Sequence, residues 1–529
     1  MTADLIVLPE RVRTLDPKAA AVADAVALAG GRVVAVGRRD EVLAWRGHAT
    51  EVVTLPGGCL LPGFHDAHVH LGQHGISLSA IDLHDAATMG VALTRVAERA
   101  RTQPAGTWIT GAGFALQRWG VPAGDTSALS AAALDAVAPH HPVLLRSQDL
   151  HAGWASGGAL RAAGIDSRTP DPEHGTIVRD ATGEPSGYLV EHAVGLVARA
   201  MPAPDAATLA AAVRAAGADF ARRGVTTVHH MAYEAPAAWR AFADAASGDD
   251  YPLRVWACIP HADVEHAAAI GLATGHGGAR FSVGGAKFFA DGALGSRTAL
   301  MLEPYLGTGD RGMPVEPPEV LHERFRLVAE AGFAPVTHAI GDAAVRAVAD
   351  ALERSADVWR PAGLLPRVEH VQHAHPDDVA RLGRLGVVAS MQPIHLTFDA
   401  ASIVSALGDR QDRAFPMRSL AAAGAVLAFG SDAPVAPPDV IEGLRAAVRR
   451  RGADGTVLPL DEALDTETAL RAFTHGAAAA IGRAHRSGIV RVGFDADLVV
   501  LDHDPLESLD DLRVLATLSA GRFTYREQA

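Results

Sequence analysis

Histidine and aspartate side chains stand at the ends of several short apolar runs in this 529-residue sequence. His68 and His70 close the segment DAHVH. On a β-strand this spacing puts both imidazoles on one face, roughly 7 Å apart at Cα. Two imidazoles so placed can share one metal ion, with bonds of about 2.0–2.1 Å. Two unrelated surface histidines are the alternative, but the preceding LPGF favours a buried strand end.

Three further residues of ligand type follow other apolar runs. His338 ends APVTH, His370 ends RVEH, and Asp432 follows AVLAFGS. Taken singly, each histidine fits a hydrogen-bonded core position, and Asp432 fits the cap of a turn. A core role does not explain why the histidines of both groups fall on one rim. An aspartate placed there can bind a metal through one oxygen and can accept the proton of a metal-activated water.

A lysine lies inside another apolar run. Lys287 stands in FSVGGAKFFADG, where burial of its amine is costly unless the amine is paired or modified. A neutral amine can take up CO₂ and become an anionic carbamate that bridges two metal ions. Pairing with Asp291, on the same strand face, is the alternative, and spacing alone favours that pairing.

The elements that must position these residues are strands alternating with alanine-rich helices. Near-continuous apolar strands with helices between them predict a parallel sheet. Eight such units predict an α/β fold, a (β/α)₈ TIM-like barrel with its active site at the C-terminal strand ends. A doubly wound open sheet is the alternative. The expected strands are 59–70, 224–231, 253–260, 281–292, 333–340, 366–373, 386–395 and 425–435.

The two ends of the chain carry short β-branched runs separated by glycine, proline and charged turns. Neither end has enough core to fold alone. We therefore predict one small β-sandwich from residues 1–57 and 487–529, and a barrel over 58–486. Residues from about 75 to 205 interrupt the barrel after its first strand as an inserted α+β subdomain. An insertion at that point emerges on the active-site face and would contribute to the substrate pocket.

Composition excludes several classes of protein. Apolar residues at 49% and charged residues at 20% are typical of a globular chain. A net charge of −14 argues against nucleic-acid partners. Cys59 and Cys258 cannot form a disulfide framework, which favours a reducing, cytoplasmic compartment. The sequence shows neither a membrane-spanning run nor a signal peptide. The 25 histidines are more than we expect for a chain of this length.

Six segments in order resemble the metal-dependent amidohydrolase superfamily: LPGFHDAHVHL, GAKFFADGALGSRTA, THAIGD, VEHVQH, ASMQPIHL and GSDAPV. The branch that resembles this chain most contains N-substituted formamide deformylases. The resemblance extends over essentially the whole chain and implies the same barrel and terminal sandwich. It implies a divalent metal, zinc above others, as one ion or two. The implied ligands of the first ion are His68, His70 and Asp432, and those of the second are His338, His370 and a bridging, carbamylated Lys287.

The resemblance also implies residues that contact the substrate. His395, in QPIH, would touch the substrate or stabilise an oxyanion, with a loop or capping role as the alternative. His151 and Trp154, in the insert, would line the pocket or pack within the subdomain. Arg297 would bind a substrate carboxylate or pair with an acidic neighbour.

We therefore expect a hydrolase that cleaves a non-peptide carbon–nitrogen bond, of the amide type, in a small molecule. Asp432 would accept the proton of the attacking water and deliver it to the leaving nitrogen. A deaminase or cyclic-amide hydrolase on the same scaffold is the alternative. A non-catalytic scaffold protein is disfavoured because all candidate ligands are present. Related barrels commonly dimerise, so we expect a homodimer, with no nucleic-acid or membrane partner.

Overall fold

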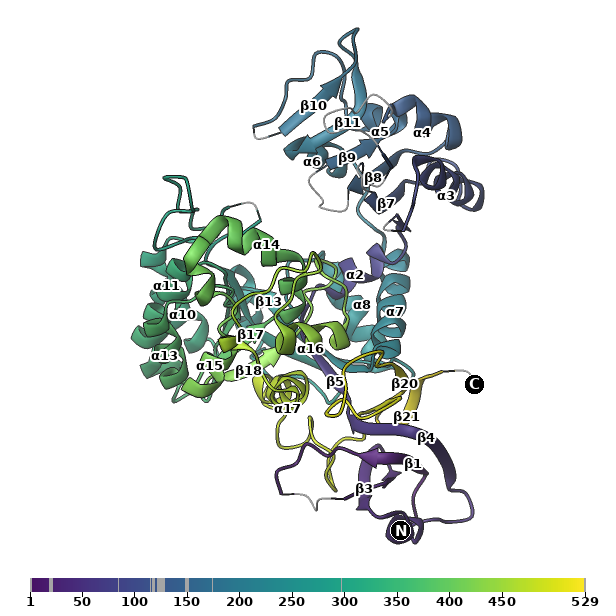
Figure 1. Cartoon of the computed structure of the whole chain (residues 1–529), viewed down its shortest axis with the longest axis vertical. Coiled ribbons are helices and arrows are strands. Elements are labelled where there is room, and N and C mark those ends of the chain that lie inside the picture. The colour runs from purple at the N-terminus through teal and green to yellow at the C-terminus, as the bar shows by residue number, and fades with distance from the viewer. Residues whose placement is uncertain are drawn as a thin grey trace. The chain divides into compact units, whose positions relative to one another are not determined.

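The computed structural model describes residues 2–18, 22–83, 85–114, 116, 119–120, 129–147, 152–173, 175–295 and 297–527. The chain forms two compact units, which Figure 1 traces in colour along the sequence. One unit comprises Met1–His74 with Val213–Ala529, and the other is Gly75–Ala212.

The first unit contains a sheet of eight parallel strands whose spatial order follows the sequence. The last residue of β5, Val69, forms a parallel bridge with Ala433 in the segment that follows β18, so the sheet is nearly closed. This confirms the TIM-like barrel, and a doubly wound sheet is excluded because the strand order never reverses. The strands are β5 (Phe64–Val69), β12 (Val225–His230), β13 (Arg254–Pro260), β14 (Phe281–Phe289), β15 (Pro335–Ala339), β16 (Arg367–His370), β17 (Val388–Met391) and β18 (Val426–Phe429).

Helices cover the outside of the barrel, as α10, α11 and α13 show in Figure 1. In α11 the buried Val345, Val348 and Leu352 recur at helical spacing, so one apolar stripe faces the sheet. The helices are α2 (Leu71–Ser77), α7 (Ala206–Arg222), α8 (Pro236–Ser247), α9 (Val264–Ala269), α10 (Pro318–Glu330), α11 (Asp342–Arg354), α12 (Ala356–Trp359), α13 (Pro376–Leu385), α14 (Leu396–Leu407), α15 (Met417–Ala423), α16 (Val440–Arg449), α17 (Thr466–Arg471) and α18 (Ala477–Ala480).

Strands from both termini build one seven-stranded sheet, in the order β21-β20-β19-β4-β1-β2-β3. The prediction that the two ends of the chain fold together is thereby confirmed. Leu5, Val26, Leu60, Leu498 and Leu518 share one buried apolar cluster, although they come from both ends of the sequence. The elements are β1 (Leu5–Val12), β2 (Ala25–Ala29), β3 (Arg32–Gly37), α1 (Arg39–Leu43), β4 (Glu51–Pro62), β19 (Leu498–Leu501), β20 (Val514–Ser519) and β21 (Arg522–Arg526).

The apolar run 59–70, expected as one barrel strand, is divided between two sheets. Residues up to Pro62 belong to β4, which pairs with β19 of the terminal sheet, and the barrel strand β5 begins at Phe64. Gly63 separates them, and a Cβ on Gly63 would lie only 2.5 Å from Thr226. The prediction was wrong here because both sheets are buried, so hydropathy does not change where the strand changes partners.

The second unit is an α+β fold, as predicted for the insert. Its six-stranded sheet has the order β10-β11-β9-β8-β7-β6 and mixes parallel and antiparallel pairs. Trp154 is fully buried in its core, and its indole N–H donates to the Ser130 carbonyl at 3.0 Å. The elements are β6 (Ile81–Asp82), α3 (Met89–Thr102), β7 (Ile109–Phe114), α4 (Ala131–Val137), β8 (Val143–Ser147), β9 (Ala152–Ala155), α5 (Gly157–Ala162), β10 (Gly175–Arg179), β11 (Pro185–Glu191) and α6 (His192–Ala198).

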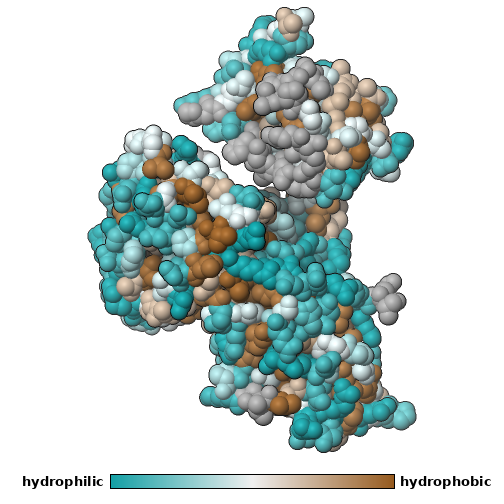
Figure 2. Space-filling view, viewed as in Figure 1, coloured by the Kyte–Doolittle hydropathy of each residue, from teal (hydrophilic) through white to brown (hydrophobic). Residues whose placement is uncertain are grey.

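The face of the molecule in Figure 2 is mainly hydrophilic, with apolar residues in small groups. Among the residues that the structure describes, no helix is both long enough and apolar enough to cross a membrane. Cys59 and Cys258 are both buried as free thiols.

Candidate metal centre

Three buried residues from different barrel strands bring ligand atoms together. His68 lies near the end of β5, His370 is the last residue of β16, and Asp432 follows β18. One ligand atom from each lies within 4.8 Å of the others. Two imidazole nitrogens and a carboxylate oxygen at this separation form a donor set suited to a single divalent ion such as zinc.

Two of the three residues reach this position through unusual backbone conformations. His370 has φ of 74° and Asp432 has φ of 65°, in the left-handed region that side chains other than glycine seldom adopt. Successive side chains of a regular strand point to opposite faces. Because the turn at His370 breaks that alternation, both Glu369 and His370 can contact the ring of His68. Such strain is typical of functional sites.

The tautomer of His68 follows from its contacts. Its Nδ1 lies 2.7 Å from Glu369 Oε2, and its Nε2 lies 3.4 Å from Asp432 Oδ1. Burial lowers the pKa of His68 well below its usual value, which favours the neutral ring. A neutral ring whose Nδ1–H donates to a carboxylate keeps its lone pair on Nε2, the atom that faces Asp432.

His370 is oriented in the same way by an amide. Its Nδ1 lies 2.7 Å from Gln392 Oε1, so Nδ1–H donates and Nε2 keeps the lone pair. The ring centroids of His68 and His370 are 4.7 Å apart. Both candidate ligands therefore present Nε2, each with its other nitrogen held by a side chain.

Two further predicted ligands lie beside this trio but are not part of it. His70 Nε2 is 3.5 Å from Asp432 Oδ1, and His70 Nδ1 is buried without a hydrogen-bond partner in the described part of the chain. The ring of His338 packs 4.4 Å from that of His370. However, His338 Nε2 lies 2.9 Å from the Gly292 carbonyl, so this nitrogen is used by the backbone.

Lys287 lies on β14 with 1% of its surface exposed, and burial lowers the pKa of its amine. Its Nζ has no hydrogen-bond partner among the described residues and lies 5.1 Å from the centre of the Phe289 ring. The alternative pairing with Asp291 is contradicted. The Asp291 carboxylate instead accepts backbone N–H groups, those of Leu300, Ile340 and Gly341 at 2.8–3.0 Å.

The buried polar atoms around the trio test whether a metal fits. Asp432 Oδ1 is buried without a hydrogen-bond partner in the described part of the structure. Burial raises the pKa of Asp432, while the charge of Lys287 opposes that rise. A buried carboxylate oxygen that faces two imidazole nitrogens and lacks a donor is costly without a cation. The residues present therefore fit a divalent metal.

The residues predicted to contact the substrate differ in their surroundings. His395 lies in a 3-10 turn (Pro393–His395), beyond the end of β17. Its Nε2 is 3.1 Å from the Ser431 carbonyl and its Nδ1 is 3.4 Å from Gln372 Nε2. Both ring nitrogens are thus used by the protein, so contact with a substrate oxygen would require the ring to release Ser431.

The other residues predicted to contact a substrate are Trp154 and His151, in the insert, and Arg297, in the unit that contains the barrel. Trp154 is fully buried in the core of the insert, which fits the packing role that we considered as the alternative, and its contact with a substrate stays a prediction. His151 lies outside the described residues. Arg297 is exposed, and its guanidinium has no ion pair in the described part of the chain. Its role toward a carboxylate stays a prediction.

Residues that the sequence analysis overlooked lie beneath the metal site. Arg367 and Glu369 are charged and fully buried, and Gln392 orients His370. A signal was available, because an arginine and a glutamate two positions apart interrupt an apolar strand in RVEH. Alternation puts such residues on one face, where they can pair.

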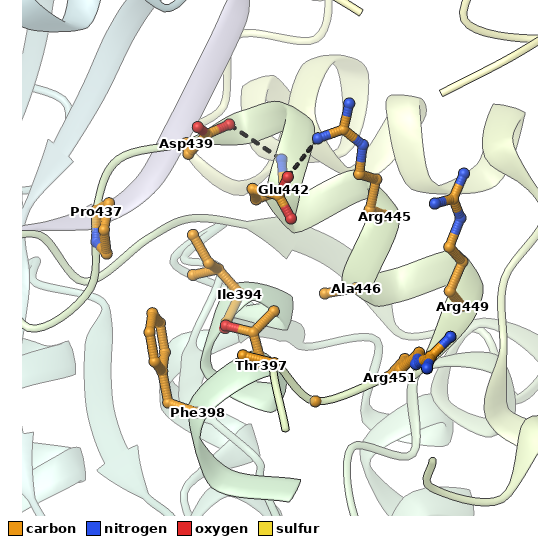
Figure 3. A pocket seen from close by; sticks show the side chains of 12 residues that line it. Ile394, Thr397, Phe398, Pro437, Asp439, Glu442, Arg445, Ala446, Arg449 and Arg451 are labelled. Atoms are coloured by element: carbon orange, nitrogen blue, oxygen red, sulfur yellow. Dashed lines mark hydrogen bonds and ion pairs between the residues drawn. The ribbon is translucent and has the colours of Figure 1, made fainter. Parts of the chain in front are cut away.

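A separate cavity of 410 Å³ opens between α14 and α16 (Figure 3). It is lined by Phe398, Arg445 and Arg449, among others, and by none of the predicted metal ligands. Arg445 pairs with Glu442, as Figure 3 shows, and Arg449 pairs with Asp510 at 2.6 Å. Because both guanidinium groups are already paired with carboxylates, these two arginines do not make the cavity an anion-binding site.

Comparison with known proteins shows the family to which the chain belongs. The model of the Amidohydrolase family matches residues 51–525. The chain is 32% identical to YtcJ of Bacillus subtilis (strain 168), over 90% of this chain and 91% of that protein. It is 29% identical to the N-substituted formamide deformylase of Arthrobacter pascens, over 99% and 98%. An uncharacterized metal-dependent hydrolase from Pyrococcus horikoshii OT3 has a similar structure, with a TM-score of 0.76, 26% identity and coverage of 95% and 98%.

Proposed function

Since the chain belongs to the amidohydrolase family, we propose that it hydrolyses a non-peptide carbon–nitrogen bond, of the amide type, in a small molecule. That it is a hydrolase follows from the family itself. The single observation that carries the mechanism is the buried trio His68, His370 and Asp432 at the C-terminal end of the barrel. This is where barrels of this architecture place their chemistry.

His68, His370 and Asp432 would hold a divalent ion, and we expect zinc because the donors are two imidazoles and one carboxylate. When bound, such an ion supplies a water of lowered pKa and polarises a substrate carbonyl. His70 lies next to this position and would complete the ligand set of one ion. A second ion would need His338 to release Gly292 and Lys287 to carry a carbamate.

The chain's own groups supply the proton transfers. The Asp432 carboxylate accepts a proton from the attacking water, since it faces the ligand nitrogens and its Oδ1 has no other donor in the described part of the chain. It then returns the proton to the leaving nitrogen, which makes the amine a better leaving group.

The amide-type substrate is supported by the deformylase of Arthrobacter pascens, which the chain matches over nearly its whole length. We propose a substrate of that chemical class, an N-substituted amide with a small acyl group. Hydrolysis then yields a carboxylic acid and an amine. A deaminase would release ammonia instead, so product analysis distinguishes the two reactions.

The experiment compares the wild type with Asp432→Asn on a panel of N-formyl and N-acetyl amines, with metal content measured in parallel. We expect stoichiometric divalent metal in the wild type and loss of both metal and turnover in the variant. Asp439→Asn is a matched control, because Asp439 caps α16 and lies outside the trio. Full activity of Asp432→Asn would overturn the mechanism, and ammonia as the product would replace the proposed substrate class.

Three further features remain predictions. A carbamate on Lys287 would give a new carbonyl signal in the ¹³C NMR spectrum after incubation with ¹³C-labelled bicarbonate. The homodimer is tested by light scattering. The proposed cytoplasmic location is supported by the presence of only two cysteines, both of them free thiols.

A further inference from the structure

A buried ion pair lies inside the barrel, next to the candidate metal ligands. Arg367 and Glu369, on β16, are 1% and 0% exposed. Arg367 Nε donates to Glu369 Oε1 at 2.9 Å, and Arg367 Nη2 lies 3.3 Å from Glu369 Oε2. Barrel interiors are usually filled by branched apolar residues. Since a buried ion pair is a weak source of stability, its presence here calls for another explanation.

The carboxylate of this pair also holds a candidate ligand. Glu369 Oε2 lies 2.7 Å from His68 Nδ1, the nitrogen opposite the one that faces Asp432. A carboxylate that accepts from one ring nitrogen fixes the tautomer and the plane of the ring, and it increases the basicity of the other nitrogen. Glu369 therefore acts on the atom of His68 that would bind the metal.

The remaining donors of Arg367 are used within the barrel as well. Its Nη2 donates to the Ala67 carbonyl at 2.7 Å and to Ser390 Oγ at 2.9 Å. Its Nη1 lies 3.0 Å from His229 Nδ1, which must accept because a guanidinium has no acceptor. Arg367 is thus anchored to three other strands, β5, β12 and β17, and cannot follow Glu369 if that side chain moves.

The polar contacts continue along the barrel axis. With Nδ1 of His229 accepting, its Nε2 carries the proton and points to His65 Nδ1 at 3.5 Å. His65 Nε2 then lies 3.2 Å from Ser487 Oγ. Each imidazole in this series has one tautomer that satisfies its neighbours. His229 therefore supplies the neutral acceptor that Arg367 requires, and His65 accepts from the other nitrogen of His229.

We propose that Glu369, anchored by Arg367, is a positioning residue of the metal centre, which holds His68 with its proton on Nδ1 and its Nε2 lone pair directed at the metal. The proposal rests on the proposed function, since it assumes that His68 is a ligand. It goes beyond that function because it assigns a role to two residues that contact neither metal nor substrate. Removal of such an outer carboxylate typically weakens metal binding by about 10–100-fold.

The test is a metal-affinity measurement on the full-length protein. The wild type and Glu369→Gln are compared by competition for Zn²⁺ with a chromophoric chelator, together with the thermal midpoint of each metal-free protein. Asp497→Asn is the matched control. Asp497 is also the buried carboxylate of an arginine pair in this unit, with Arg254 Nε at 2.6 Å, but it contacts none of the candidate ligands.

We expect Glu369→Gln to lose about 10-fold or more in Zn²⁺ affinity, whereas Asp497→Asn loses thermal stability without a change in affinity. Equal affinity of Glu369→Gln and the wild type would overturn the proposal. An equal loss of affinity in both variants would also overturn it, since that result indicates a purely structural role. If the wild type itself binds no Zn²⁺, the proposed function fails, and that outcome is distinct from the other two.

A second measurement reads the tautomer of His68 in the wild type itself. In ¹⁵N-histidine-labelled, metal-free wild type, the tautomer of each ring is read from its nitrogen chemical shifts, with His68 assigned by its absence in His68→Gln. The expected result is a proton on Nδ1 of His68. A proton on Nε2 would refute the role of Glu369.

Discussion

The Ser431 hydroxyl donates a hydrogen bond of 2.5 Å to Asp66 Oδ2, across the seam where the first and last strands of the barrel meet. The Ser431 N–H donates to the other oxygen of the same carboxylate at 2.9 Å. On either side of this contact, Asp432 N donates to the His68 carbonyl at 2.7 Å, and His70 N donates to the Ala433 carbonyl at 2.8 Å. The residues that close the barrel are therefore the neighbours of the candidate ligands.

Because of these contacts at the seam, we expect Asp66→Ala to weaken metal binding, although Asp66 is not a candidate ligand. The change leaves the N–H and the hydroxyl of Ser431 buried without an acceptor, at a cost of about 1–3 kcal/mol each. Ser431→Ala removes only the hydroxyl, so its effect should be smaller. Zinc content after dialysis measures both. A larger loss in Ser431→Ala than in Asp66→Ala would contradict this account.

Gly430 allows the close approach of the same two strands. A Cβ at this position would lie 2.5 Å from His68 N and 2.6 Å from Asp66 Oδ1. Because backbone cannot move aside without opening the seam, Gly430→Ala should lower both the thermal midpoint and the zinc content. Gly278→Ala is the control, since a Cβ there meets nothing within 4 Å. Wild-type zinc content in Gly430→Ala would show that the seam does not set ligand geometry.

Arg254 and Asp497 join the barrel to the terminal sheet. Arg254, on β13, donates to the Asp497 carboxylate at 2.6 and 3.1 Å, and both side chains are buried. Asp497→Ala leaves the buried Arg254 guanidinium with only the more distant carboxylate of Asp495, at 4.0 Å, so the loss should approach about 3–5 kcal/mol. Thermal unfolding measures the loss. Asp249→Ala removes an exposed carboxyl 3.8 Å from Arg522 and should change little. Similar midpoints in the two variants would argue against a stabilising role for the buried pair.

The buried His373 should contribute to the loss of folding stability at acid pH. Its ring is buried, neither nitrogen has a hydrogen-bond partner in the described part of the chain, and burial lowers its pKa to about 3. The unfolded chain binds a proton at a pKa of about 6.5. Stability from this group is therefore complete above pH 6.5 and is lost as the pH falls from about 6.5 toward 3, by up to about 1.4 kcal/mol per pH unit.

Replacement of this ring by a group that does not titrate should flatten that dependence. In His373→Phe the thermal midpoint should fall less between pH 7 and pH 5 than in the wild type. His266→Phe, on the exposed face of α9, should follow the wild-type curve. If both variants follow the wild type, His373 does not contribute to the acid sensitivity.

The amino-acid sequence alone predicted the barrel and the shared terminal sheet, and it located each barrel strand to within several residues of its observed ends. The alternation of apolar strands with helices is a local property of the sequence, and it does not depend on which elements the strands pack against. It therefore located His338, His370 and Asp432 near the ends of barrel strands before any contact was known. The same local signal could not reveal that residues 59–62 leave the barrel, because both sheets bury them equally.

Only the tertiary structure decided which atoms meet. It joined His68 to Glu369 across 301 positions and turned the Nε2 of His338 toward a backbone carbonyl. It also put His370 and Asp432 in left-handed conformations that strand periodicity does not predict. Ring orientation, tautomer and charge pairing depend on through-space neighbours and on burial, and these exist only once the eight strands have closed around their shared interior.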